Sequence, residues 1–144
     1  MFCPPQPLDL RSDEEQIQDL KKEIDGSKTS RSKEEILKMR MEYRVLNERF
    51  LGRGYEARFW ELWGLATDEG WQRRGLAGRL VEFGMGEIGE MGREQEGVEG
   101  VYVVASLKGQ RMYEKAGFEM VGKSGGGEDE AAGLSHVWFV KKFV

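Results

Sequence analysis

The second half of the chain alternates between strand-like and helix-like segments, and this order limits the possible folds more than any other feature. Residues 59–67 (FWELWGLAT) are rich in aromatic side chains, as strands are. Residues 75–93 repeat apolar side chains at helical spacing, and residues 101–105 (VYVVA) form a short apolar run that is typical of a buried strand. Two strands that are separated by a helix lie parallel in one sheet, so the sequence predicts an α/β fold.

The remaining segments predict how this sheet is completed. Residues 107–115 favour a short helix, and residues 117–123 and 135–143 favour strands. The glycine-rich residues 124–133 predict a loop that joins these two strands as an antiparallel pair. Because a parallel pair and an antiparallel pair occur together, the predicted central sheet is a mixed one.

The first half of the chain predicts helices. Ser12 and Glu15 have the spacing of a capping box, and so do Ser32 and Glu35. Behind the second box, apolar side chains recur every three or four residues, which indicates an amphipathic helix; they are Ile36, Met39, Tyr43, Leu46 and Phe50. We therefore predict a flexible, proline-containing tail over residues 1–11, a helical N-terminal segment over residues 12–58, and an α/β domain over residues 59–144.

Composition argues against several classes of function. The 22 basic and 26 acidic side chains leave a net charge of −4, which argues against nucleic acid or an anionic membrane as a partner. No apolar run approaches the roughly 20 residues of a membrane-spanning helix, and the first residues lack the pattern of a signal peptide, so we expect a cytoplasmic protein. With one cysteine and one histidine the chain can form no internal disulfide, and we expect no metal site.

The junction between the first predicted strand and the next helix carries the clearest chemical signal. Residues 67–78 (TDEGWQRRGLAG) place a glycine-containing turn at the start of that helix. The first N–H groups of a helix are unpaired and lie at the positive end of its dipole, so they can bind a phosphate. Arg73 and Arg74 add positive charge, and Gly75 and Gly78 let a ligand approach the backbone. From spacing alone, an ordinary strand–helix turn with solvated arginines explains these residues equally well.

Two motifs in this half of the chain resemble those of a known enzyme family. Residues 72–77 (QRRGLA) match the signature Q/R-x-x-G-x-G/A of the GNAT family of N-acetyltransferases, whose members bind acetyl-coenzyme A. Residues 112–118 (MYEKAGF) resemble the family's segment LYEKxGF, and one helix and one buried strand separate the two motifs, as in that family. The resemblance covers residues 60–144 and implies a mixed central sheet of the acyl-CoA N-acyltransferase type. The family's N-terminal strands are missing, so the implied fold is truncated and carries a helical N-terminal extension.

The resemblance implies that acetyl-coenzyme A (acetyl-CoA) is the co-substrate. Backbone amides of residues 73–78 would hold its pyrophosphate, and the strands that end near Thr67 and Ala105 would part to admit its pantetheine arm. Main-chain groups of residues 65–67 would pair with that arm. The implied coenzyme-binding residues are Leu65, Ala66, Thr67, Gln72, Arg73, Arg74, Gly75, Leu76, Ala77, Gly78 and Ser106.

The resemblance also implies how protons are handled. Tyr113 occupies the position of the tyrosine that protonates the departing thiolate in many members, although such an aromatic residue can equally pack a short helix onto the sheet. A carboxylate or a water chain must accept the proton of the amine. Glu61, near the start of the first strand, is our candidate for this base, and Asp68, near its end, is the alternative.

These implications support one main functional hypothesis and two alternatives. In the main hypothesis, the chain transfers an acetyl group from acetyl-CoA to a small-molecule or peptide amine by direct attack in a ternary complex. In the second, it is a degenerate GNAT-like domain that binds coenzyme A or a partner protein without catalysis. In the third, its sheet edge and amphipathic helix form an oligomer such as a homodimer.

Overall fold

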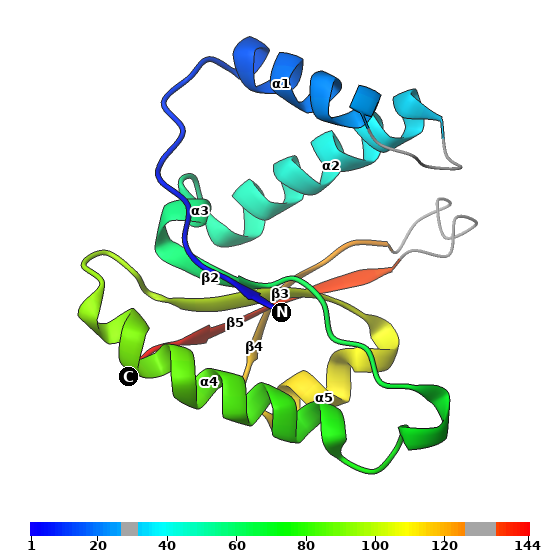
Figure 1. Cartoon of the computed structure of the whole chain (residues 1–144), viewed down its shortest axis with the longest axis vertical. Coiled ribbons are helices and arrows are strands. Elements are labelled where there is room, and N and C mark those ends of the chain that lie inside the picture. The colour runs from blue at the N-terminus through cyan, green and yellow to red at the C-terminus, as the bar shows by residue number, and fades with distance from the viewer. Residues whose placement is uncertain (27–31, 126–134) are drawn as a thin grey trace. The chain divides into compact units, whose positions relative to one another are not determined.

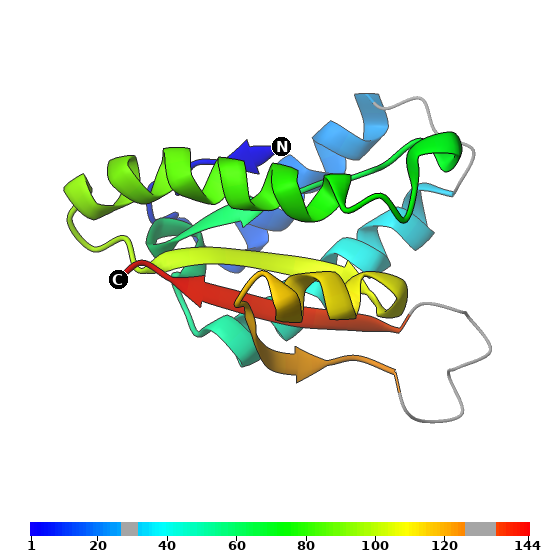
Figure 2. The same cartoon turned by 90° about the horizontal axis from the view of Figure 1, so that it is seen from below.

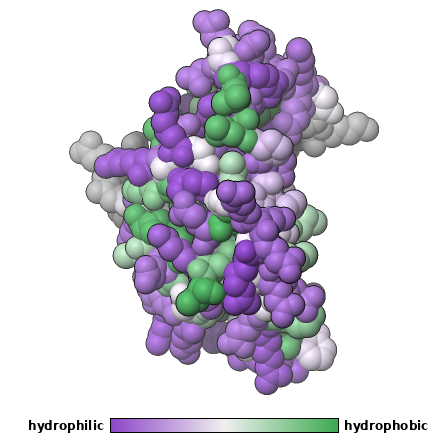
Figure 3. All heavy atoms as spheres, turned by 90° about the vertical axis from the view of Figure 1, so that its left-hand side faces the viewer, coloured by the Kyte–Doolittle hydropathy of each residue, from purple (hydrophilic) through white to green (hydrophobic). Residues whose placement is uncertain are grey.

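The computed structural model describes residues 1–26, 32–125 and 135–144, and these residues form two compact units (Figure 1). One unit is Leu8–Gly54, and the other combines Met1–Pro7 with Tyr55–Val144. Most of the loop predicted over residues 124–133 lies outside the described residues. The surface shown in Figure 3 is mainly hydrophilic, in keeping with a chain of which 33% is charged.

The unit Leu8–Gly54 contains helices α1 (Asp13–Gly26) and α2 (Lys33–Leu51), and both begin at the predicted capping boxes. The Ser12 hydroxyl accepts from the Glu15 N–H at 3.3 Å, and the Glu15 carboxylate accepts from the Ser12 N–H at 2.9 Å. Ser32 and Glu35 form the same reciprocal pair. Ion pairs also join the two helices; they are Arg44–Asp13, Arg40–Glu23 and Lys33–Asp25, at 3.2, 3.1 and 2.8 Å.

The other unit contains a five-stranded sheet in the order β1-β2-β3-β5-β4. Its strands are β1 (Phe2–Cys3), β2 (Phe59–Leu62), β3 (Gly100–Ser106), β4 (Glu119–Lys123) and β5 (His136–Lys142). Strands β2 and β3 pair in parallel and the other neighbours pair antiparallel, which confirms the predicted mixed sheet. Strands β2 and β3 can be parallel because α4 (Leu76–Glu94) forms the crossover between them. A tight turn would join two neighbouring strands as an antiparallel pair.

Helices α4 and α5 (Gln110–Lys115) cover one face of this sheet, as Figure 2 shows. Between them and the strands lies a core of buried apolar side chains, including Val81 and Ile88 of α4 and Val101 and Val103 of β3. Side chains alternate between the two faces of a strand. Consequently Trp60 and Leu62 of β2 belong to this core, while Glu61 between them faces the opposite side.

Several short elements complete the chain. A single helical turn, α3 (Tyr55–Arg58), leads directly into β2. The 3-10 turn η1 (Glu69–Trp71) precedes α4, and a second, η2 (Leu107–Gly109), leads into α5. The short helix predicted over residues 107–115 is therefore a 3-10 turn followed by an α-helix.

Two segments differ from the predictions. The strand predicted over residues 59–67 ends at Leu62, because its parallel partner β3 is paired with it only as far as Glu61. Residues 2–3, within the predicted flexible tail of residues 1–11, form strand β1 beside β2, and the Met1 carbonyl accepts from the Trp63 N–H at 3.0 Å. Pro4 and Pro5 limit β1 to two residues, since proline has no N–H to donate.

Candidate functional site

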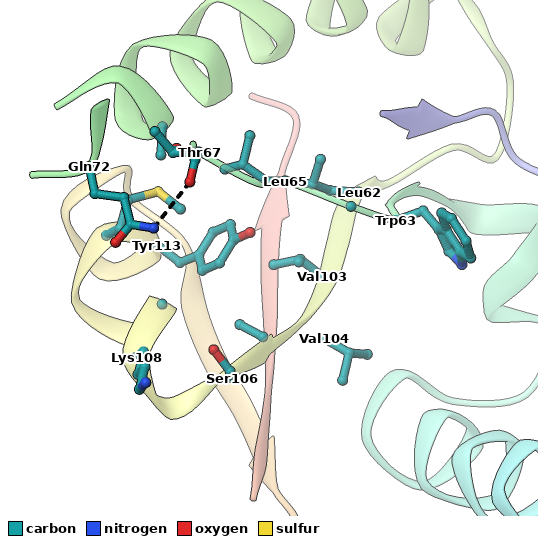
Figure 4. Close-up of a pocket in the computed structure, with 15 residues that line it drawn as sticks. Leu62, Trp63, Leu65, Thr67, Gln72, Val103, Val104, Ser106, Lys108 and Tyr113 are labelled. Carbon is teal, nitrogen blue, oxygen red and sulfur yellow. Dashed lines mark hydrogen bonds between the residues drawn. The ribbon is translucent and has the colours of Figure 1, made fainter. Parts of the chain in front are cut away.

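A cavity opens in the sheet where β2 and β3 stop pairing. Three residue pairs join these strands, and the last is Glu61 with Tyr102. Beyond it β3 pairs only with β5, up to Ser106, while the chain after β2 leaves toward η1. The resulting cavity has a volume of about 470 Å³. Its walls come from the segment after β2, the end of β3, and the first turns of α4 and α5 (Figure 4).

Six of the residues implied by the family resemblance line this cavity: Leu65, Thr67, Gln72, Ala77, Ser106 and Tyr113. The others do not line it: Glu61, Ala66, Arg73, Arg74, Gly75, Leu76 and Gly78. The remaining lining residues were not predicted as site residues: Leu62, Trp63, Gly64, Val103, Val104, Ala105, Lys108, Gly109 and Met112. Among the lining residues that were not predicted, Gly109 could have been found from the sequence, because it precedes Tyr113 by one helical turn.

The N-terminus of α4 is open toward solvent beside this cavity. Its N-cap, Gly75, has a left-handed backbone (φ 75°) and forms no side-chain cap. The Arg79 N–H donates to the Gly75 carbonyl at 3.1 Å as the first bond of the helix, so the three preceding N–H groups have no partner within it. A Cβ atom at Gly75 or Gly78 would meet no atom within 4 Å. The helix therefore presents free donors to an unfilled space, as an anion site requires.

The loop before α4 is held in place by its own side chains. The Gln72 amide donates to the Thr67 carbonyl at 3.1 Å, the hydrogen bond drawn in Figure 4. The Arg74 guanidinium stacks over the Trp71 ring at 4.7 Å. Arg73 also has a left-handed backbone (φ 61°), which costs a residue with a side chain about 1 kcal/mol or more. The Trp71 contact holds the Arg74 side chain in the loop that leads into α4, and Arg73 precedes it in the same loop.

Tyr113 places a phenol in the wall of the cavity. Its side chain comes from α5, and its ring packs on Phe118 and Phe139, with centroids 5.6 and 5.8 Å apart. The hydroxyl makes no hydrogen bond to any described residue and points into the gap between Leu65 and Val103 (Figure 4). Burial raises the pKa of Tyr113 above its usual value, so the phenol keeps its proton at neutral pH.

The two candidate bases lie in different surroundings. Glu61 is partly buried on the sheet face away from α4, where the Tyr102 hydroxyl lies beside its carboxylate because the two residues are register partners. Burial raises the pKa of Glu61, and the Tyr102 hydroxyl lowers it by a smaller amount. Asp68 instead caps η1, where its carboxylate accepts from the Gly70 N–H at 3.1 Å. The alternative base is therefore engaged in holding a turn.

Within the described ranges, no group of three or more His, Cys, Asp or Glu side chains could hold a metal ion. The same ranges contain no helix that is both long and apolar enough to cross a membrane.

Comparisons with known proteins give two matches. Residues 40–118, more than half of the 144, match the family model described as Acetyltransferase (GNAT) family. The fold is similar to the crystal structure of mosquito arylalkylamine N-acetyltransferase like 5b, with a TM-score of 0.64 and 20% sequence identity. That match covers 99% of this chain and 66% of the mosquito chain, so this chain spans about two thirds of its length. No curated protein matches the sequence.

Proposed function

The chain belongs to the acetyltransferase (GNAT) family, and from this premise we propose that it transfers an acetyl group from acetyl-CoA to an amine by direct attack in a ternary complex. One observation carries the proposal: β2 and β3 part to form a cavity next to an uncapped helix N-terminus. An anion site beside a cavity lined by both apolar and polar groups suits a ligand that joins a pyrophosphate to a thioester arm carrying amides.

Acetyl-CoA fits the residues present. The N–H groups at the start of α4 would bind the pyrophosphate, and Arg73 and Arg74 would add positive charge. The pantetheine arm would lie in the cavity. The N–H groups of Leu65, Ala66 and Thr67 make no hydrogen bond to any described residue, so they are available to that arm. Ser106 would border the arm from the opposite wall.

Two side chains would act in proton transfer, one as the general base and the other as the general acid. Glu61, on the sheet face away from α4, would accept a proton from the attacking amine, which we place on that face. The amine nitrogen would form a bond to the acetyl carbon as the carbon–sulfur bond breaks. Tyr113 would donate its proton to the departing sulfur, since its free hydroxyl points into the cavity that would hold the thioester.

The first experiment is calorimetric titration with acetyl-CoA, using NAD as a control ligand that also contains a pyrophosphate. We expect the chain to bind acetyl-CoA at micromolar concentration and NAD far more weakly. Binding should then be followed by a screen of amines for acetyl transfer. No binding of acetyl-CoA would contradict the proposal.

Gly78→Glu tests the pyrophosphate site directly. Gly78 is in the first turn of α4 with open space before it, where a glutamate favours the helix but repels phosphate. We expect acetyl-CoA to bind more weakly by a factor on the order of ten to one hundred, with no loss of thermal stability. Gly78→Gln is the matched control, with nearly the same volume and no charge. Equal affinities of the two variants would place the pyrophosphate elsewhere.

A second candidate function is coenzyme binding without catalysis. It is favoured by the placement of the two candidate bases, because Glu61 does not line the cavity and Asp68 caps η1. Tight binding of acetyl-CoA with no transfer to any amine would support this alternative. Measured transfer would exclude it.

A further inference from the structure

The last pair of residues that joins β2 to β3 has its own chemistry. Glu61 and Tyr102 are opposite each other in the register, and the cavity begins immediately beyond them. Trp63 and Val104, each two residues further along the chain, line the cavity. Glu61 is therefore about one alternation of the strand, roughly 7 Å, from the cavity wall, on the face where the amine is proposed to arrive.

Tyr102 is held rigidly beside this carboxylate. Its side chain is only 4% exposed, and its ring meets the Tyr55 ring edge-on, with centroids 5.6 Å apart at 87°. Glu61 and Tyr102 are register partners on one face of the sheet, which brings the Tyr102 hydroxyl beside the Glu61 carboxylate. Because the ring cannot turn without disturbing its packing on Tyr55, the hydroxyl offers the carboxylate a donor at a fixed position.

The surroundings of Glu61 contain no opposing cation. Within the described structure it forms no ion pair with a lysine or arginine. Its neighbours come from both adjacent strands and from α3. The titratable groups that they contribute are Cys3 of β1, Tyr102 of β3, and Tyr55 and Glu56 of α3, of which Glu56 acts on Tyr102. The next residue in the register, Val140 of β5, is apolar.

We propose that Tyr102 is a positioning residue for acetyl transfer, whose hydroxyl orients the Glu61 carboxylate so that it can accept the proton of the amine. This inference rests on the function proposed above. Tyr102 keeps its own proton throughout, and the proton of the amine ends on Glu61.

Two opposing effects explain why such a partner is needed. Burial raises the pKa of Glu61, which makes it a stronger base but favours its protonated form. The Tyr102 hydroxyl stabilises the charged form and lowers this pKa. Burial, assisted by the charge of Glu61, raises the pKa of Tyr102 itself, so its hydroxyl remains a donor. Without Tyr102, a larger fraction of Glu61 would be protonated and inactive.

The test replaces the hydroxyl and retains the ring, with Tyr102→Phe. The titration of Glu61 is followed by carbon NMR on protein with labelled glutamate carboxyls, and the Glu61 signal is assigned by its loss in Glu61→Gln. Loss of a hydrogen-bond donor beside a charged group should move this titration up by about one pH unit. The acid limb of kcat/KM should move up equally, and the rate on the plateau should fall because the carboxylate is no longer held in one orientation. Tyr55→Phe, which removes a neighbouring hydroxyl, should leave the Glu61 titration in place.

A double-mutant cycle separates positioning from a merely structural role. In the Glu61→Gln background, Tyr102→Phe should have no further effect on the rate, whereas a structural role would lower the rate equally in both backgrounds. An unchanged Glu61 titration, or an acid limb that does not follow it, would overturn the proposal. The NMR titration needs no turnover. A failure of the proposed activity would therefore be recognised separately, as product missing from every variant while the Glu61 shift persists.

Discussion

The Tyr113 side chain combines a packed ring with a hydroxyl that faces the cavity. Its ring contributes to the core through Phe118 and Phe139, while its hydroxyl has no partner among the described residues. Because this hydroxyl faces the cavity, the ring contacts do not require it, and phenylalanine would pack on the same neighbours. The retained hydroxyl supports the proposed role as the acid.

The variant Tyr113→Phe tests this role. We expect kcat to fall by a factor on the order of 10², the lower range for loss of a general acid, with little change in the dissociation constant of acetyl-CoA. The melting temperature should be unchanged or slightly higher, because the variant removes no described hydrogen bond.

The pH dependence provides a second measurement on the same residue. Since burial raises the pKa of Tyr113, its neutral, proton-donating form persists to a pH above the ordinary tyrosine value of about 10. No alkaline loss of activity below that pH should therefore depend on Tyr113. An unaltered kcat in Tyr113→Phe would assign the proton donation to another group.

Among the elements, α4 has the most unusual composition because it contains five glycines within Leu76–Glu94. Their surroundings differ. A Cβ atom at Gly92 would overlap the Phe143 ring, and one at Gly84 would overlap the Phe2 ring. A Cβ atom at Gly86 would meet nothing within 4 Å. Close packing thus accounts for two of these glycines and leaves Gly86 without a packing reason.

Alanine substitutions in α4 should therefore have opposite effects on stability. Gly86→Ala should stabilise the protein by about 0.5–1 kcal/mol, because alanine loses less backbone entropy in a helix. Gly92→Ala should destabilise it by about 1–3 kcal/mol, since the added methyl group would overlap the partly buried Phe143 ring. Thermal or denaturant unfolding of the two variants measures both effects. If both were stabilising, the contact between α4 and Phe143 would be looser than the structure shows.

Over the whole molecule, strand pairing and burial are most extensive in the centre of the sheet. Strands β3 and β5 pair along seven residues and carry fully buried side chains, including Val101, Val137 and Phe139. The segment after β2 has little of this support, because N–H groups of residues 65–67 have no described partner. In the proposed coenzyme site, one wall is therefore the well-paired strand β3, and the other is the segment of residues 65–67, which has few hydrogen bonds.

Hydrogen exchange should reveal this difference. In the free protein we expect amides of β3 and β5 to exchange slowly and those of residues 65–67 to exchange quickly. Saturating acetyl-CoA should slow exchange at residues 65–67 and in the first turn of α4, since both would then have partners. NAD should protect neither segment. Protection by acetyl-CoA that appeared only outside these two segments would contradict the proposed pose of the pantetheine arm.

Local sequence patterns determined most of the elements. Capping boxes at Ser12 and Ser32 marked the starts of both N-terminal helices, and the apolar run 101–105 marked the central strand. The motif at residues 72–77 likewise predicted an open helix start, which Gly75 provides. These features could be predicted because caps, helical periodicity and buried runs act over a few residues.

Contacts between distant segments were decided only by the tertiary structure. The pairing of Phe2–Cys3 with β2, the end of β2 at Leu62, and the placement of Lys108 in the cavity wall depend on where the strands meet in space. The contact between Glu61 and Tyr102 likewise joins residues 41 positions apart through the register of the sheet. The sequence by itself determined which segments become helices and strands and where an anion site could form. Only the tertiary structure decided which side chains share the cavity and which carboxylate has a hydroxyl partner, because register and face follow from packing the whole sheet.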